Sequence, residues 1–203
     1  MLCGLTKPEG GTITIDGVPL TKSPSAIGYM LQKDHLFEWR NIFSNISLGL
    51  EIQKRLDEPA RQELLEMMAA YGLAGFEYAK PSELSGGMRQ RAALIRTLAL
   101  KPDLLLLDEP FSALDYQTRL SVCDDISSII RQTHKTAILV THDLSEAISV
   151  ADRILVLSPR PGRVKKILSI DFPENCIRSL DRRNCPEFST YFNMVWKELK
   201  TYE

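Results

Sequence analysis

The sequence lacks any apolar run long enough to cross a lipid bilayer. A membrane-spanning helix needs roughly 20 predominantly apolar residues, whereas the apolar runs here, such as residues 104–107, have the length of one buried strand. We also find no signal peptide at the start of the chain. The sequence therefore predicts a soluble protein, whose association with a membrane would have to go through a partner.

The chain also has almost no net charge and few cysteines. Its 25 Lys and Arg residues oppose 26 Asp and Glu residues, so no basic field exists to neutralise phosphates, and we expect no nucleic-acid partner. Cys3, Cys123, Cys176 and Cys185 form no CxxC pair, and none stands beside a histidine at metal-ligand spacing. We therefore expect four reduced thiols in a cytosolic protein.

What is present suits one compact domain, or one large domain with a small tail. The 203 residues are 44% apolar and 25% charged, a balance that allows a sizeable core. Short apolar segments alternate with helical patterns, which predicts an α/β domain with a mostly parallel sheet. We expect strands at residues 12–15, 27–31, 104–107, 137–140, 154–157 and 164–170, and helices at residues 42–52, 59–71, 88–100, 120–130, 144–151 and 192–199.

Three local patterns refine this expectation. The dipeptide at residues 16–17, Asp-Gly, is preferred in tight hairpin turns, where positive φ is required. Leu64, Leu65, Met67 and Met68 have helical spacing and predict an apolar core face of their helix. The strands at residues 104–107 and 137–140 are continuously apolar, and we expect both to be buried.

The composition changes near residue 173. Residues 173–203 are polar, with Arg178, Arg182 and Arg183 close together. We interpret this segment as a solvated C-terminal tail, with a regulatory segment as the alternative. The main domain would then cover residues 1–172.

An acidic pair at the end of an apolar strand is the strongest chemical feature. Asp108 and Glu109 directly follow residues 104–107. In open parallel sheets, ligands bind beyond the carboxyl ends of the strands. Asp108 can hold Mg²⁺ there, and Glu109 can accept the proton of an attacking water. The structural alternative is an acidic cap that leads into the next helix.

A glycine-rich helix start is the second feature. Ser85 is a good N-cap, and Gly86 and Gly87 would let a phosphate approach the backbone N–H groups of the first turn. Glycine is a poor choice in the first turns of a helix unless another group must come close. The alternative is an ordinary capped helix with glycines in the preceding turn.

Two further polar residues stand at predicted strand ends. His142 can donate a hydrogen bond to a γ-phosphate, although a lone histidine is more often structural. Gln32 can orient a water or contact the metal. His35 and His134 have no such setting, and we interpret both as surface residues.

The order of these features resembles that of the ATP-binding-cassette (ABC) ATPases. Gln32, residues 84–91 (LSGGMRQR), residues 104–110 (LLLLDEP), residues 112–115 (SALD) and His142 are similar to the Q-loop, signature motif, Walker B motif, D-loop and switch histidine of that family. Five matches in one order, over about 110 residues, form a specific signal.

The resemblance runs from residue 1 to about residue 170 and implies a fold. That fold is an α/β domain of the P-loop NTPase type, with a mostly parallel core sheet. Residues 1–172 would form the ATP-binding domain, and its helical subdomain would cover about residues 42–100.

The resemblance also implies roles at the nucleotide. Asp108 would be the acid of the Mg²⁺ site, with Gln32 as a second metal contact and as the residue that couples nucleotide state to a transmembrane partner. Glu109 would be the general base, and His142 would sense the γ-phosphate of ATP.

Other roles implied by the resemblance depend on a second subunit. Ser85, Gly86, Gly87 and Gln90 would contact ATP held by the other subunit of a head-to-tail dimer, and Asp115 would cross the dimer interface. The segment between Gln32 and Ser85 looks like the region that receives the partner's coupling helix.

A narrower resemblance is to the nitrate/sulfonate/taurine importer group. It is carried by residues 108–119 (DEPFSALDYQTR), residues 141–147 (THDLSEA), residues 151–163 (ADRILVLSPRPGR) and Trp39. The proline usual before that tryptophan is Glu38 here, which departs from the group pattern.

One expected part of the family pattern is missing from the sequence. No Gly-x-x-x-x-Gly-Lys-Ser/Thr motif occurs in the 203 residues. That loop, Walker A, would hold the phosphates with its backbone N–H groups and its lysine. Residues 1–8 resemble the far end of the helix that follows it, so we expect an N-terminally truncated domain. Three explanations remain open: a gene fragment or truncated gene model, a degenerate subunit paired with a complete one, or a chain cut deliberately.

The sequence thus predicts the energy-coupling subunit of an ABC importer for a small anion or organic solute. The resemblance implies ATP and Mg²⁺ as cofactors, a homodimer or a full-length cassette partner, a transmembrane permease and an external solute-binding protein. It places the subunit peripherally, on the cytoplasmic side of the cell membrane. Without Walker A, we expect negligible ATPase activity of the 203-residue chain. The alternatives are a degenerate non-catalytic partner and a non-transport ABC ATPase.

Overall fold

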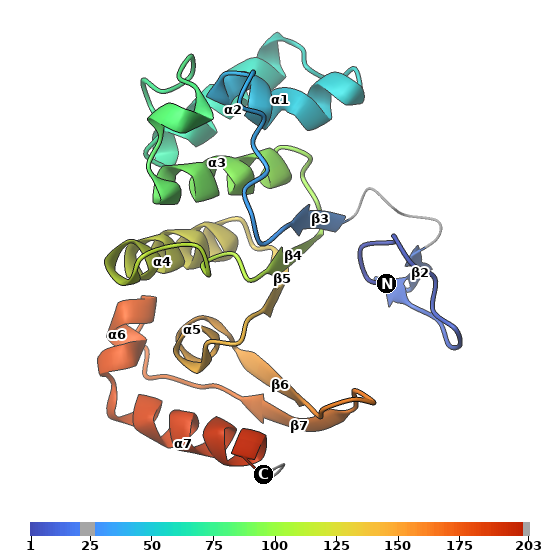
Figure 1. Cartoon of the computed structure of the whole chain (residues 1–203), viewed down its shortest axis with the longest axis vertical. Helices are drawn as coiled ribbons and strands as arrows, with labels where there is room; N and C mark the ends of the chain where they lie inside the picture. Colours follow the sequence, from blue (N-terminus) through green and yellow to red (C-terminus); the bar gives the residue numbers. More distant parts are fainter. Residues whose placement is uncertain (21–26, 201–203) are drawn as a thin grey trace.

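The computed structural model describes residues 1–20 and 27–200, and residues 27–200 lie in three tiers. Figure 1 shows a helical tier with α1, α2 and α3 at one end of the long axis. A parallel sheet with α4 lies in the middle, and a hairpin with α5, α6 and α7 lies at the other end. The predicted α/β class is therefore confirmed.

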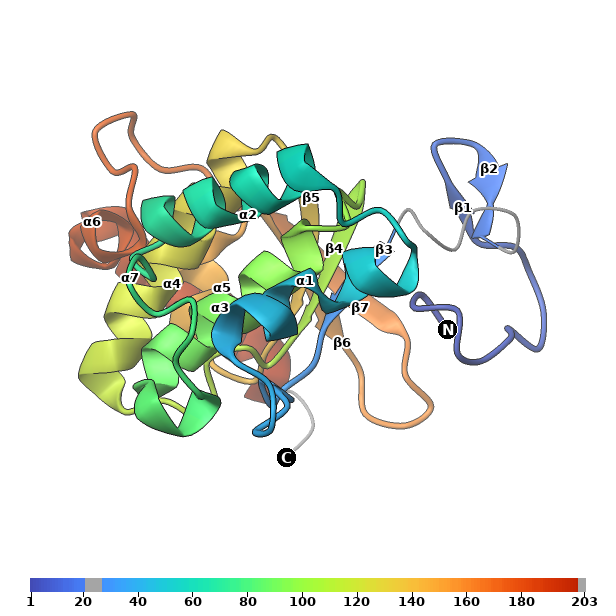
Figure 2. The same ribbon diagram turned by 90° about the horizontal axis from the view of Figure 1, so that it is seen from above.

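A short hairpin stands near the N-terminus. Strands β1 (Thr14–Ile15) and β2 (Val18–Pro19) pair antiparallel, with Ile15 opposite Val18. Asp16 and Gly17 between them both have positive φ, as the Asp-Gly pattern predicts. Figure 2 shows this hairpin to one side of the other elements.

The central sheet has the order β3-β4-β5 and is entirely parallel. Strands β3 (Ile27–Met30) and β5 (Thr136–Val140) flank β4 (Leu104–Asp108), and residues 104–107 of β4 are buried as predicted. The predicted strand at residues 137–140 is present, but the prediction that it is buried was wrong, because Ile138 and Val140 are 38% and 55% exposed. Among the described residues, β5 pairs with β4 alone, and one of its faces stays open.

Helices cover one side of this sheet and build the helical tier. Helix α1 (Ile42–Ile52) has the predicted bounds, and α2 (Glu58–Ala70) carries Pro59 in its first turn. A 3₁₀ turn (Pro81–Glu83) leads into α3 (Gly86–Leu98). In α2, residues 64 and 68 are buried as expected, but Leu65 is exposed, so the apolar face is narrower than the sequence indicated.

Two further helices follow the strands of the sheet. Helix α4 (Tyr116–Gln132) begins earlier than predicted because Asp115 caps its first turn. Helix α5 (Leu144–Val150) is one residue shorter than predicted, and Asp143 caps it. A core of buried side chains from α3, β4 and α4 joins these layers: Ala93, Leu94, Leu98, Leu105, Leu107, Val122, Cys123, Ile126 and Ile129.

The third tier contains an antiparallel hairpin and the C-terminal helices. Strands β6 (Arg153–Leu157) and β7 (Val164–Ser169) pair with each other, and α6 (Ser179–Asn184) and α7 (Pro186–Lys200) follow. The prediction of a solvated tail was wrong for α7, because Val195 is buried in a core cluster with side chains of α5, β6 and Ile170. Helix α7 also extends beyond the predicted residues 192–199 at both ends.

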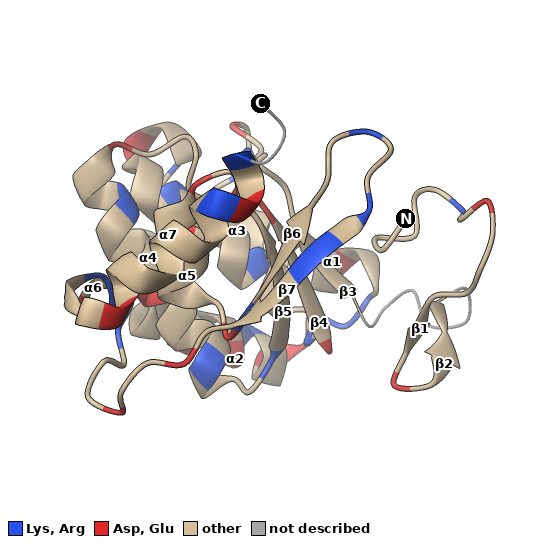
Figure 3. Ribbon diagram, turned by 90° about the horizontal axis from the view of Figure 1, so that it is seen from below, with Lys and Arg blue, Asp and Glu red and all other residues tan. Residues whose placement is uncertain are grey.

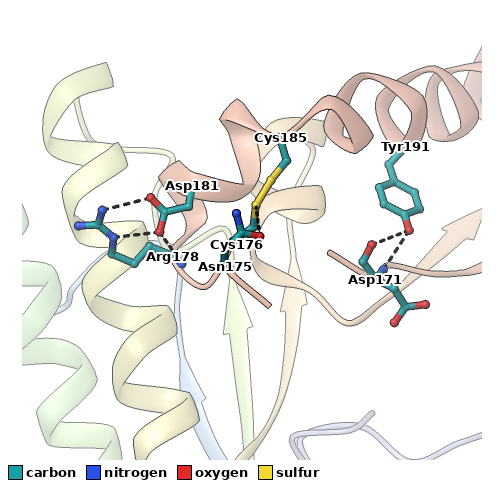
Figure 4. Close-up of a disulfide and its surroundings, with 7 residues drawn as sticks. All are labelled: Asp171, Asn175, Cys176, Arg178, Asp181, Cys185 and Tyr191. Carbon is teal, nitrogen blue, oxygen red and sulfur yellow. Dashed lines mark hydrogen bonds and ion pairs between the residues drawn. A yellow bond between two sulfur atoms is a disulfide. The ribbon is translucent and has the colours of Figure 1, made fainter. Parts of the chain in front are cut away.

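The cysteines correct a second expectation. Cys176 and Cys185 are joined by a disulfide, and only Cys3 and Cys123 are free thiols. Figure 4 shows the disulfide linking the segment before α6 to the turn before α7. Beside it, Arg178 pairs with Asp181, and the hydroxyl of Tyr191 bonds to the backbone of Asp171.

Charged residues of both signs occur on the helices and loops of the fold. Figure 3 shows Lys and Arg interspersed with Asp and Glu along the chain. Within residues 1–20 and 27–200, none of the helices combines the length and the apolar character that a bilayer-crossing helix needs.

Candidate functional site

Glu109 is the centre of the candidate site. It follows β4 directly, and its two carboxylate oxygens contact side chains from two different loops. The Oε1 atom lies 2.9 Å from Nδ1 of His142, and Oε2 accepts a hydrogen bond of 3.3 Å from Nε2 of Gln32. The structure therefore brings together three residues that the sequence placed at the ends of three strands.

The backbone of Glu109 is held in an unusual conformation. Its φ is 44°, in the left-handed region that residues other than glycine rarely adopt. Three hydrogen bonds fix it there: its N–H donates to the carbonyl of Val140, and its carbonyl accepts from the N–H and the hydroxyl of Ser112. Strain of this kind persists where the surroundings over-determine it, and such positions cluster at functional sites.

The charge of Glu109 acts on His142. The pKa of His142 is raised, first by the hydrogen bond with Glu109 and then by the charge of the same carboxylate. The His142 side chain is 75% exposed, so it can reach a ligand at the open end of the sheet. An imidazolium beside a carboxylate at this position suits the recognition of a phosphate oxygen.

Asp108 lies beside this group and has a partner that sequence reasoning missed. The hydroxyl of Tyr29, in β3, donates a hydrogen bond of 3.0 Å to Oδ2 of Asp108. This bond raises the pKa of Tyr29, with burial as a smaller cause. The sequence held one signal for it, since Tyr29 lies three residues before Gln32 in a strand expected to end at the site.

The donors present fit part of a Mg²⁺ site. Asp108 offers a carboxylate, and Gln32 keeps a carbonyl oxygen because its amide nitrogen donates to Glu109 and Ser112. Magnesium commonly takes one or two carboxylates and completes its shell with waters and phosphate oxygens. Nowhere in the described parts of the chain do three His, Cys, Asp or Glu side chains gather as a metal cluster. The set therefore fits Mg²⁺ only together with a bound phosphate.

The signature residues form a second group, at the start of α3. The hydroxyl of Ser85 accepts from the N–H of Met88, so Ser85 is an N-cap as predicted. A Cβ on Gly87 would lie 2.9 Å from methyl groups of Thr118 and Val122 in α4, closer than side chains tolerate. Helix packing therefore requires Gly87, which is buried, whatever ligand approaches the helix start.

Gly86 differs from Gly87 because it is exposed. A Cβ there would lie 3.1 Å from one methyl group of Leu114, a close but adjustable contact. Gly86 thus remains a position where a ligand can approach the backbone of the first turn. The contact also places the start of α3 beside the residue that precedes Asp115.

Two other predicted site residues, Asp115 and Gln90, lie outside the group around Glu109. Asp115 caps α4 by accepting from the N–H of Thr118, and hydrogen bonds from the Thr118 side chain and backbone lower its pKa. The side chain of Gln90 is 3% exposed, and its Oε1 has no hydrogen-bond partner among the described residues. Gln90 therefore faces the interior and not the open end of the sheet.

A charged contact joins the loop after Gln32 to α3. The Nε and Nη2 atoms of Arg89 donate to the carboxylate of Asp34, at 2.9 and 3.2 Å, and Arg89 also pairs with Glu38. Arg96 of the same helix donates to the backbone carbonyls of Asp34 and His35. The Gln32 loop and the signature helix are thus tied together by two arginines, which sequence reasoning did not identify.

Comparisons with known proteins assign this arrangement to a family. A family model described as "ABC transporter" matches residues 1–112. The chain is 45% identical over 203 residues to the uncharacterized ABC transporter ATP-binding protein YtlC of Bacillus subtilis, covering all of this chain and 78% of that protein. It is 42% identical over 172 residues to the taurine import ATP-binding protein TauB of Yersinia pestis, covering 85% of this chain and 68% of that protein.

A solved structure agrees with the fold. It is the dimeric structure of a post-hydrolysis state of the ATP-binding cassette MJ0796 bound to ADP and Pi. The two chains are 30% identical with a TM-score of 0.68, over 84% of this chain and 77% of the other. The fold is thus that of an ABC ATPase, and the chain belongs to the ATP-binding subunits of ABC transporters.

Proposed function

We propose that this chain provides the catalytic acid–base group and the signature motif of an ATP-hydrolysing subunit of an ABC importer. The imported solute would be a small anion or organic solute of the nitrate, sulfonate or taurine class. The convergence of Gln32 and His142 on the carboxylate of Glu109 carries the proposal. The 42% identity to a taurine import ATP-binding protein supports the narrower solute class.

Each residue of the first group has a task in ATP hydrolysis. Glu109 accepts the proton of the attacking water, because its carboxylate stands at the end of β4, where ligands of parallel sheets bind. His142, whose Nδ1 contacts this carboxylate, would donate to the γ-phosphate. Asp108 and Gln32 would hold Mg²⁺, which supplies charge stabilisation for the phosphate oxygens when bound.

The second group would serve the ATP of another subunit. Ser85 and Gly86 present the exposed first turn of α3, where the helix dipole and the backbone N–H groups favour an anion. Asp115, which lies next to Leu114 at this helix start, would cross between the subunits. A head-to-tail dimer, or a pair with a complete cassette, would bring these residues to the opposite phosphate.

The surface beside the Gln32 loop suits a membrane-embedded partner. Trp39 and Tyr78 expose 73% and 84% of their surfaces, and Nζ of Lys80 donates to the carbonyl of Trp39. Exposed aromatic side chains are enriched where proteins bind each other. A permease seated here would act on Gln32 through the Arg89–Asp34 contact and would hold the subunit on the cytoplasmic side of the membrane, with a solute-binding protein outside.

A phosphate loop would have to be added to this set of residues. The 203 residues contain no Walker A motif, so we expect that this chain alone binds ATP weakly and hydrolyses it negligibly. The second candidate function is that of a non-catalytic partner, in which the chain lends only its signature turn to a complete cassette.

A fusion tests the proposal directly. A phosphate-loop segment from a complete ABC ATPase is joined ahead of Met1, and ATP hydrolysis by the fusion is compared with that of the 203-residue chain. We expect turnover only in the fusion. Glu109→Gln should lower it roughly 100- to 10,000-fold, the usual contribution of a general base. Glu66→Gln, on the exposed side of α2, is the matched control and should leave turnover unchanged.

The outcomes separate the two candidates. A fusion that binds ATP but does not turn it over, or that keeps its turnover with Glu109→Gln, would contradict the catalytic assignment. The second candidate predicts a different result, in which the unfused chain restores activity to a complete cassette whose own signature serine has been replaced.

A further inference from the structure

The two neighbours of His142 are both anchored to the start of α5. The hydroxyl of Thr141 donates to Oε2 of Glu146 at 2.7 Å and accepts from the N–H of Asp143 at 3.0 Å. The carboxylate of Asp143 accepts from the N–H groups of Ser145 and Glu146. Among the described residues, the side chain of His142 hydrogen-bonds only with Glu109, so its direction also depends on how these neighbours hold the backbone.

Glu146 is an unusual anchor because it is buried. Only 3% of its surface is exposed, and burial raises the pKa of its carboxyl group. A buried carboxylate is costly unless it is paired and hydrogen-bonded. Thr141 supplies the hydrogen bond, and the positive charge comes from a different helix.

That charge is Arg119, in the first turn of α4. Its Nη1 lies 3.6 Å from Oδ2 of Asp143 and 3.8 Å from Oε1 of Glu146. Its Nη2 donates to the carbonyl of Leu114 at 3.0 Å, and its backbone N–H donates to the carbonyl of Asp115 at 2.8 Å. One guanidinium therefore contacts the loop that carries His142 and the loop that carries Asp115.

From this geometry we infer that Arg119 and Glu146 are positioning residues for His142, and that Arg119 ties the His142 loop to the Asp115 loop. The inference rests on the proposed function, in which His142 contacts the γ-phosphate and Asp115 crosses to the other subunit. A change at the subunit boundary would reach the loop that carries His142 through Arg119 and its contacts with Asp143 and Glu146.

The chemistry of arginine suits this role. Its guanidinium is planar and offers five N–H donors in a fixed fork, so it can contact two carboxylates and a carbonyl at once. A lysine would keep the charge but would contact fewer of these groups. The fork, and not only the charge, is therefore the feature to test.

Because of the charges around His142, the direction in which its pKa changes on removal of Arg119 distinguishes a positioning role from a purely electrostatic one. Glu109 after β4 and Asp143 and Glu146 on α5 are negative, whereas Arg119 on α4 is positive. If Arg119 acted on His142 only through its charge, removing it would raise the pKa of His142, because one repulsion would vanish. If Arg119 positions His142, removing it loosens the contact with Glu109, and the pKa of His142 falls.

The experiment is an NMR titration of the histidine imidazoles in the nucleotide-free 203-residue chain. Only three histidines are present, and loss of one resonance in His142→Gln assigns His142. The variants are Arg119→Ala, Arg119→Lys and Glu146→Gln. The matched control is Arg131→Ala. Arg131 lies in the same helix as Arg119, but its side chain donates to the carbonyl of Ile177.

We expect the midpoint of His142 to fall in Arg119→Ala and to recover only partly in Arg119→Lys, while Arg131→Ala leaves it unchanged. Glu146→Gln should also lower it, but the loss of a negative charge near His142 already has that effect, so the test of positioning for Glu146 is the broadening of the resonances of residues 141–143. Circular dichroism verifies that each variant is folded, and Arg119→Lys keeps the test available if the alanine variant unfolds. An unchanged or raised midpoint in the folded Arg119 variants would overturn the inference.

The titration uses no nucleotide, so its result is independent of ATP hydrolysis. A lowered midpoint together with an inactive fusion would support the positioning inference and contradict the proposed reaction. An active fusion with an unchanged midpoint would support the proposed reaction and contradict the positioning role of Arg119.

Discussion

Nδ1 of His142 lies 2.9 Å from Oε1 of Glu109, although 33 positions separate the two residues in the chain. The contact exists because β4 and β5 are parallel neighbours, with Asp108 beside Val140 in register, so that the residues after both strands meet at one edge of the sheet. The acid–base pair therefore depends on the pairing of β4 with β5, because each strand provides only one of its two residues.

This pair gives a pH-dependent contribution to stability. Because the folded pKa of His142 is raised, the contribution is fully present below the ordinary histidine pKa and is lost as pH rises through the raised value. We expect Glu109→Gln to lower the His142 midpoint measured by NMR. Denaturant titrations of wild type and His142→Gln should differ more at pH 6 than at pH 9. Equal differences at the two pH values would contradict the pairing.

The glycine at position 87 should be required for folding before it is required for any ligand. A Cβ there meets Thr118 and Val122 at 2.9 Å, and overpacking of this kind costs about 1–3 kcal/mol. We therefore expect Gly87→Ala to lower the free energy of unfolding by about that amount. Gly162→Ala, where a Cβ meets nothing within 4 Å, is the control and should change stability little. A Gly87→Ala variant as stable as this control would show that α4 yields at this contact.

The sequence allowed most of the sheet edge to be predicted, because strand ends and polar residues are local patterns. Residues 104–107 followed by Asp108 and Glu109 carried both the strand and its chemistry, and the structure agrees with the strand. The sequence motif, however, did not show that Gly87 packs against α4 or that Gln90 faces the interior. Those facts depend on which face of α3 meets α4, and helical periodicity does not specify the neighbour.

The long-range ionic contacts could not be predicted from the sequence either. Arg89 and Asp34 are 55 positions apart, and nothing in either local pattern pairs them. The exposure of β5 was missed for a similar reason, since an apolar strand is buried only if other elements cover both of its faces. Pairing partners and covering layers are properties of the whole fold, whereas motifs are properties of a few consecutive residues.

The Arg89–Asp34 contact predicts a loss of stability in acid. Burial raises the pKa of Asp34, but the hydrogen bonds from Arg89 and from the N–H of Leu36, with the charges of Arg89 and Arg96, together lower it by more, so the net pKa lies below its ordinary value. Its contribution is present above the unfolded pKa and is lost as pH falls through the folded value. We expect Asp34→Asn to be less stable than wild type at pH 7, with the difference shrinking toward pH 3.

The matched control for this pair is Glu63→Gln, which removes a carboxylate from a more exposed pair with Lys101. Exposed pairs contribute little, so this variant should be close to wild type at both pH values. If Asp34→Asn matched Glu63→Gln at pH 7, the contact between the Gln32 loop and α3 would be as weak as a surface pair.

The hairpin of β6 and β7 has one buried and one open apolar face. We therefore expect replacement by threonine to have different effects on the two faces. Leu155 lies opposite Ile167, and they are 55% and 56% exposed, whereas Val156 is buried against the core that includes Val195. Leu155→Thr should change the free energy of unfolding by less than about 0.5 kcal/mol and should slow aggregation, because it interrupts an exposed apolar patch. Val156→Thr places an extra hydroxyl in the core and should cost about 1–3 kcal/mol. Chemical denaturation and light scattering measure the two effects, and equal stability losses would mean that the outer face of the hairpin is covered in solution.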